Sequence, residues 1–194
     1  AIVIGGQNVL PFYTFDAPIE NAPKVGVEVS DVANAVMQGV DTVMLADETA
    51  QGDFPLLAVE EMQKIILYTQ KNSRIPAPEH EYSGEYENYD ALSESAARLA
   101  EKIGADYLVC QTSSGATAAA VAAQRPNLPI LSVTSSPRVA GQLALTYATT
   151  SYVRPNTDTY GLDLAQDLKA AGDIAPSADK KDITIILTSG TTGA

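Results

Sequence analysis

The second half of the chain alternates short apolar runs with amphipathic segments, and this alternation restricts the fold more than any other feature of the sequence. Helices are predicted over 91–103, 116–124, 139–146 and 162–171, and strands over 107–110, 130–133, 151–153 and 183–187. Strands that alternate with helices of about 10–15 residues are typical of a mostly parallel sheet with helices on both faces. We therefore predict an α/β fold, with a three-layer α/β/α domain over residues 90–194.

A smaller pattern of the same kind occupies residues 1–74. The predicted elements are strands over 1–4 and 42–45, a helix capped by Ser30 or Asp31 that ends at Gln38, a helix over 56–72, and a loop over 11–26. Two strands and two helices cannot close a sheet, and open parallel edges need cover from neighbouring strands. We expect the terminal part of a larger (β/α)8 barrel, or a rearrangement into a dimer or an altered fold.

Charge and cysteine content exclude several classes of function. The chain carries 12 basic and 24 acidic residues, a net charge of −12, whereas a nucleic-acid-binding surface needs basic patches. Part of the acidity lies in residues 75–89, which we interpret as a solvated linker. No apolar run reaches the roughly 20 residues that span a bilayer. The single cysteine, Cys110, excludes an internal disulfide and favours a reducing, cytoplasmic location.

Two segments resemble the pyruvate kinase family. EVSDVANAVMQGVDTVMLADETAQGDFPLLAVEEM, residues 28–62, is similar to the block that leads into the last helix of that family's barrel. ESAARLAEKIGADYLVCQTSSGATAAAVAAQRPNLPILSVTSSPRVAGQLAL, residues 94–145, is similar to its C-terminal domain, including the S-G-x-T-A turn and the R-P-x-x-P-I strand entry. The resemblance implies a fragment of that enzyme, which transfers a phosphoryl group from phosphoenolpyruvate to ADP. It also implies a final strand beyond residue 194.

The resemblance places catalysis at the mouth of the barrel, with Mg²⁺, K⁺ and a lysine as the cationic partners. The strands that carry those groups in the family precede this chain, so we expect no cofactor or metal site in it. Gly6 stands where the family has a threonine, Gln7 is retained, and Leu10 and Pro11 replace a glutamate and a serine. Gly6 and Gln7 are remnant barrel-mouth positions, and we expect the chain alone to be catalytically inactive.

A second candidate site is the turn between the strand over 107–110 and the helix over 116–124. Backbone N–H groups and a helix dipole converge at such a turn and favour an anion. In the family the equivalent turn binds a phosphate of an activating sugar phosphate, which implies a site made of Thr112, Ser113, Ser114, Gly115, Ala116 and Thr117. The alternative is an ordinary turn in which Ser113 or Ser114 caps the helix.

Two departures from the family leave the effector open. Ala116 stands where many relatives have a basic residue, and residues 188–193 are small and uncharged where fructose-bisphosphate-responsive relatives are aromatic and basic. A different sugar phosphate, a nucleotide monophosphate or no effector at all are each compatible with this pattern.

Other polar residues are weaker candidates. His80 lies in the acidic linker with no partner at metal-ligand spacing. Cys110 ends an apolar strand and is expected to be a buried small hydrophobe. The acidic residues Asp47, Glu48 and Asp53 precede or begin helical segments, where capping explains them without a metal.

Three accounts of function follow. The first is the C-terminal portion of a pyruvate kinase that serves subunit association and effector binding, with the missing N-terminal part as its partner. The family's members are typically tetramers, so the resemblance implies self-association. The second is a standalone, non-catalytic protein that binds a phosphorylated ligand, favoured by the substitutions at Gly6, Leu10 and Pro11. The third is a purely structural interaction module.

Overall fold

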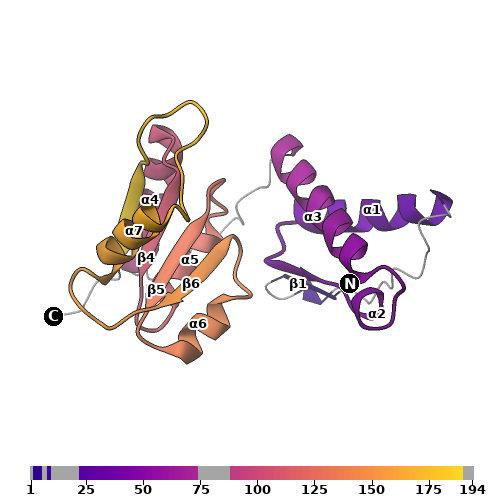
Figure 1. Ribbon diagram of the computed structural model, residues 1–194, viewed down its shortest axis with the longest axis horizontal. Coiled ribbons are helices and arrows are strands. Elements are labelled where there is room, and N and C mark those ends of the chain that lie inside the picture. Colours follow the sequence, from indigo (N-terminus) through magenta and orange to yellow (C-terminus); the bar gives the residue numbers. More distant parts are fainter. Residues whose placement is uncertain (1, 6–7, 10–21, 74–87, 190–194) are drawn as a thin grey trace. The chain divides into compact units, whose positions relative to one another are not determined.

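The structure is a computed structural model that describes residues 2–5, 8–9, 22–73 and 88–189 (Figure 1). The chain divides into two compact units, Ala1–Ala77 and Pro78–Ala194, with the division inside the predicted linker. Gly6, Gln7 and His80 lie outside the described residues. None of the helices in the described ranges is both long enough and apolar enough to cross a membrane.

The second unit alternates helices and strands as the sequence predicts. Its elements are α4 (Asn88–Ile103), β4 (Tyr107–Gln111), α5 (Ala116–Ala123), β5 (Ile130–Thr134), α6 (Pro137–Leu143), β6 (Thr149–Val153), α7 (Tyr160–Ala171) and β7 (Ile185–Ser189). The four strands form one sheet in the order β6-β5-β4-β7, and every neighbouring pair is parallel. The predicted α/β/α fold with a parallel sheet is therefore confirmed.

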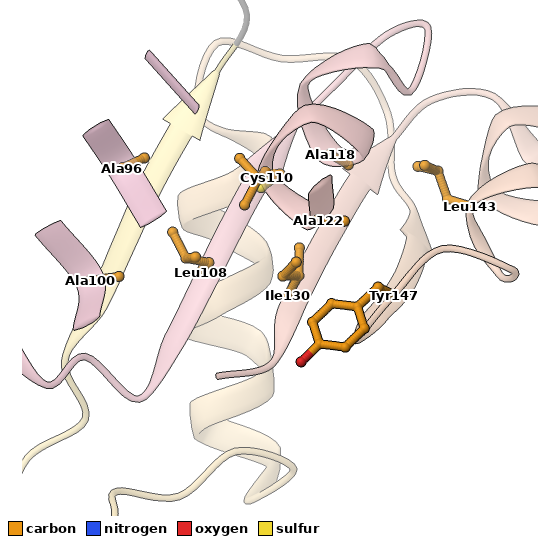
Figure 2. Packing of buried hydrophobic residues seen from close by; sticks show 10 residues of the cluster. Ala96, Ala100, Leu108, Cys110, Ala118, Ala122, Ile130, Leu143 and Tyr147 are labelled. Atoms are coloured by element: carbon orange, nitrogen blue, oxygen red, sulfur yellow. The ribbon is translucent and has the colours of Figure 1, made fainter. Parts of the chain in front are cut away.

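Two apolar clusters hold the three layers together, one on each face of the sheet. Figure 2 shows the first, in which the sheet contacts α4, α5 and α6 through Ala96, Ala100, Leu108, Cys110, Ala118, Ala122, Ile130, Leu143 and Tyr147. The second cluster joins the opposite face of the sheet to α7 through Val109, Leu131, Val133, Tyr160, Leu164, Ala165 and Leu168. Successive residues of β4 point to opposite faces of the sheet, as the two-residue period of a strand requires. The central strand is buried from both sides.

The first unit contains two helices of substantial length and a small sheet. Its elements are β1 (Ile2–Gly5), β2 (Asn8–Val9), α1 (Ala22–Met37), β3 (Thr42–Met44), α2 (Asp47–Ala50) and α3 (Pro55–Asn72). Helix α1 packs on α3, and the buried side chains of the pair include Val32 and Val36 of α1 and Met62 of α3. Residues 32 and 36 lie one turn apart, so they form a single apolar face.

Two features of this unit differ from the sequence prediction. Helix α1 begins at Ala22, not near Ser30, because Pro23 occupies its first turn, where the missing N–H costs nothing and the fixed φ suits a helix. Strands β1 and β3, which a (β/α) repeat would place parallel, pair antiparallel with Ile4 opposite Thr42. Among the described residues they have no parallel neighbours of a barrel to set their direction, and antiparallel pairing also satisfies their backbone groups.

Candidate functional site

The predicted phosphate turn lies at the point where the strand order of the sheet reverses. Strand β4 has β5 on one side and β7 on the other. The chain leaves β4 for α5 on one face of the sheet and reaches β7 from α7 on the opposite face. In open α/β sheets, ligands bind outside the carboxyl ends of the strands at such a point. The turn that follows β4 is therefore correctly placed to receive a small molecule.

Internal hydrogen bonds fix the shape of this turn. The Thr112 amide donates to the Val133 carbonyl of β5 at 3.0 Å. The Thr112 hydroxyl oxygen accepts from the Gly115 amide at 2.9 Å in a buried position. Gly115 adopts a left-handed conformation, with φ 93° and ψ −12°, immediately before α5. The chain can thus reverse sharply between strand and helix, because glycine has no Cβ to oppose a positive φ.

The predicted serine cap is not the one that the structure uses. The residue at the N-cap position of α5 is Gly115, and no side chain accepts a hydrogen bond there as a cap. The Ser114 hydroxyl lies 3.4 Å from the Ala116 amide, which is a long contact. Thr112 makes the shorter bond from the strand side of the turn. A cap is predicted from a sequence by how close a polar residue lies to the start of the helix. That rule does not detect Thr112, which accepts its hydrogen bond from the other side of the turn.

The turn offers polar groups to solvent on one side only. Ser113, Ser114 and Ala116 are exposed, whereas Thr112 and Thr117 are 4% and 5% exposed. The amides of Ser113 and Ser114 donate to no acceptor within the described part of the protein. Two backbone donors and two hydroxyls therefore stand in front of the amino end of α5, where the helix dipole favours negative charge. A set of donors of this kind at a helix amino end favours an anion.

Two glycines allow α6 and α7 to pack closely against the two ends of the turn. Gly115 lies in the turn and faces α6, and Gly161 lies in α7 and faces Gln111 at the end of β4. A Cβ at Gly115 would lie 3.3 Å from Val139 Cγ1 and 3.5 Å from Leu143 Cδ2, both on α6. A Cβ at Gly161, in the first turn of α7, would lie 2.6 Å from Gln111 Cγ. Neither of these contacts was predicted from the sequence. For the contact between Gly161 and Gln111, the sequence feature that could have indicated it is a glycine within the first turn of a helix.

Ionisable groups beneath the turn remain protonated at neutral pH. Tyr160 is buried, and burial raises the pKa of its phenol while the nearby Thr112 amide acts in the opposite direction. Cys110 is fully buried, as predicted, and burial raises the pKa of its thiol to about 12. A thiol of that pKa carries almost no thiolate, so Cys110 is chemically inert.

The acidic side chains that the structure describes in the first unit do not assemble into a metal site. Within the described ranges, no group of three or more histidine, cysteine, aspartate or glutamate side chains could hold a metal ion. The Glu48 carboxylate instead accepts a hydrogen bond from the Ala46 amide at 2.8 Å, at the start of α2. Asp53 is exposed. The Glu48 contact is of the helix-capping kind that the sequence suggested.

The sheet order and the donor-rich turn define this unit as a doubly wound α/β domain with a potential anion site at its switch point. The family profile "Pyruvate kinase, alpha/beta domain" matches residues 90–194, and "Pyruvate kinase, barrel domain" matches residues 11–59. The chain belongs to the pyruvate kinase family.

Relatives and solved structures agree with this assignment. The pyruvate kinase of Corynebacterium glutamicum is 34% identical over 194 residues, covering 96% of this chain and 39% of the relative. That of Corynebacterium efficiens is 36% identical over 162 residues, covering 81% and 34%. The structure of Cryptosporidium parvum pyruvate kinase in complex with ADP has a TM-score of 0.73 and 28% identity, covering 84% of this chain and 33% of that one. The chain thus spans between about a third and two-fifths of the length of these proteins.

Proposed function

We propose that this chain is the C-terminal portion of a pyruvate kinase, and that its own tasks are to bind a phosphorylated small molecule and to join subunits. The whole enzyme would transfer a phosphoryl group from phosphoenolpyruvate to ADP, with Mg²⁺ and K⁺ held by parts that precede this chain. Alone, the chain would be inactive, because phosphoryl transfer requires its metal and cationic partners to be present together. A cytoplasmic location goes with this role.

The ligand-binding proposal rests on the exposed hydrogen-bond donors of the turn after β4. Its exposed side presents the amides and hydroxyls of Ser113 and Ser114 at the amino end of α5. Helix amino ends that carry such donors are common phosphate sites in proteins. Since Ala116 adds no charge at the helix start, a monoanionic or dianionic phosphate would be held by hydrogen bonds and the helix dipole. A sugar phosphate and a nucleotide monophosphate both supply that group.

A thermal titration tests this ligand class. We expect glucose 6-phosphate or AMP, added at about one hundred times its dissociation constant, to stabilise the second unit by about 2.7 kcal/mol. The same concentrations of glucose and adenosine serve as controls and should leave the melting temperature unchanged. A shift with inorganic phosphate alone would indicate an unspecific anion site, and no shift with any phosphorylated compound would contradict the proposal.

The surface that we propose for subunit association lies on α4 and the neighbouring edge strand β7. Leu92, Leu99 and Ile103 of α4 are 37%, 48% and 49% exposed. Positions 92, 99 and 103 form one stripe along the helix, and this stripe borders the buried face that includes Ala96 and Ala100. An apolar helix stripe beside an open strand edge is suited to a second copy of the same surface related by a twofold axis.

Replacing Leu99 with glutamate should dissociate the assembly. The introduced carboxylate would lose its hydration if the stripe were covered by a partner, at a cost of several kcal/mol. Sedimentation velocity is expected to show an oligomer for the native chain and a monomer for Leu99→Glu. Leu162→Glu, at an exposed position of α7 outside this stripe, should leave the oligomer intact. A native chain that sediments as a monomer over the accessible concentration range would refute the association surface.

A further inference from the structure

Residues 172–184 connect α7 to β7 across the amino ends of the strands, and one buried carboxylate holds them there. The Asp106 side chain, just before β4, is 2% exposed. Its Oδ1 accepts from the Ser177 amide at 2.9 Å, from the Ser177 hydroxyl, and from Lys180 Nζ at 3.2 Å. Its Oδ2 accepts from the Thr184 amide at 2.8 Å. One residue thus binds the segment at three points along its length.

The segment has other contacts besides the carboxylate, among them a backbone hydrogen bond from the Asp106 amide to the Thr184 carbonyl at 2.8 Å. The Tyr107 hydroxyl donates to the Ala175 carbonyl at 3.4 Å and accepts from the Ala175 amide at 3.3 Å. Lys180 Nζ also donates to the Gly104 carbonyl. Ile174 is 6% exposed and belongs to the second apolar cluster, against which Ile183 packs as a partly buried neighbour. Two isoleucines are a small apolar anchor for 13 residues of chain.

We propose that residues 172–184, which we call the strap, open and close as one unit on a folded sheet, with Asp106 as the latch. Segments with few buried apolar contacts open at a lower free energy than the core around them. Here four hydrogen bonds converge on one carboxylate, so its removal releases Ser177 and weakens the attachment of Lys180 and Thr184, which keep their bonds to the Gly104 carbonyl and the Asp106 amide. Opening uncovers Ile174 and one end of the second apolar cluster.

The latch remains closed at physiological pH. The Ser177 hydroxyl, then the amides of Thr184 and Ser177, and finally Lys180 hold the pKa of the Asp106 carboxyl well below its ordinary value. Because the pKa of Asp106 is lowered in the folded protein, its carboxylate stabilises the closed strap fully at any pH above the ordinary aspartate pKa of about 3.9. This stabilisation is lost as the pH falls from there toward the lowered pKa of Asp106. Loss of the carboxylate by substitution therefore opens the strap under conditions in which acid does not.

Native-state hydrogen exchange of the full chain tests the latch. The informative amides are those of Ala175 and Lys180, because they donate to Tyr107 Oη and to the Ser177 carbonyl and not to Asp106. In Asp106→Asn we expect both amides to exchange at least about tenfold faster, since several bonds to a charged acceptor are lost. The amide of Leu131 in β5 should change by less than about twofold.

Two further variants test whether the effect is specific to the Asp106 carboxylate. Asp179→Asn removes an exposed carboxylate of the same strap and should leave all rates unchanged. Ser177→Ala retains the carboxylate and removes one donor, so it should accelerate Ala175 and Lys180 by roughly threefold. Equal acceleration at Leu131 and in the strap would show that Asp106 stabilises the whole unit rather than a separate strap. Unchanged rates at Ala175 and Lys180 would show that other contacts hold it.

Discussion

Leu164→Ala is expected to lower the free energy of unfolding of the second unit by about 2–5 kcal/mol. Leu164 is fully buried in the cluster between α7 and the sheet. The substitution loses the transfer free energy of the removed methyl groups and leaves a cavity that the rigid parallel strands can only partly fill. A loss of this size is a large fraction of the 5–15 kcal/mol that stabilise a typical domain. Urea denaturation followed by the amide signals of β4 and β5 measures it.

Leu162→Ala provides a matched control on the same helix. Leu162 lies two residues earlier in α7 and is 47% exposed, so the substitution leaves no cavity and should change the stability by no more than about 0.5 kcal/mol. Equal effects at the two positions would mean that α7 does not present Leu164 to the sheet, and the assignment of the second apolar cluster would be wrong.

Gly115→Ala is expected to destabilise the second unit by about 2–4 kcal/mol and to abolish the proposed phosphate binding. A residue with a Cβ pays about 1–2 kcal/mol in the left-handed conformation that Gly115 adopts. Its Cβ would also lie 3.3 Å from Val139 Cγ1 of α6, which is tighter than an ordinary contact and adds an overpacking cost. Relief of either strain moves the turn and misaligns the amides of Ser113 and Ser114.

Substitutions at two other glycines separate the cost of the left-handed conformation from the cost of the close contact with α6. Gly172 has a positive φ of 78° but open space around a Cβ, so Gly172→Ala should cost only the conformational part, about 1–2 kcal/mol. Gly141 lies within α6, also with open space, and Gly141→Ala should stabilise by about 0.5–1 kcal/mol. Neither control should alter phosphate binding. A Gly115→Ala protein as stable as the native chain would contradict the geometry of the turn.

The sequence predicts the second unit well because three of its four strands are largely apolar and its helices have clear ends. Every predicted element of residues 90–194 appears in the structure, with boundaries that differ by a few residues. The first unit is harder to predict, since Pro23 resembles a loop residue but occupies the first turn of α1. A proline is equally compatible with both positions, and local propensity cannot distinguish them.

The position of the candidate site can be predicted from the sequence, whereas the contacts that hold the turn in place cannot. The turn Thr112–Thr117 follows from its place between a strand and a helix. The bond between Thr112 and Gly115, and the contacts of Gly161 with Gln111, depend on how α6 and α7 pack. The latch of the strap joins Asp106 to Ser177 across 71 residues of sequence. Contacts at such separations have no periodic signature in a single chain.

The most direct test of the proposed function is an NMR titration of the ¹⁵N-labelled chain with glucose 6-phosphate or AMP. We predict saturable shifts of the Ser113, Ser114 and Ala116 amides, which should be absent with glucose or adenosine and absent in Gly115→Ala. Gly172→Ala should retain them. Saturable shifts that map elsewhere on the second unit, or turn amides that do not move at millimolar concentrations of either compound, would contradict a phosphate site at the turn after β4.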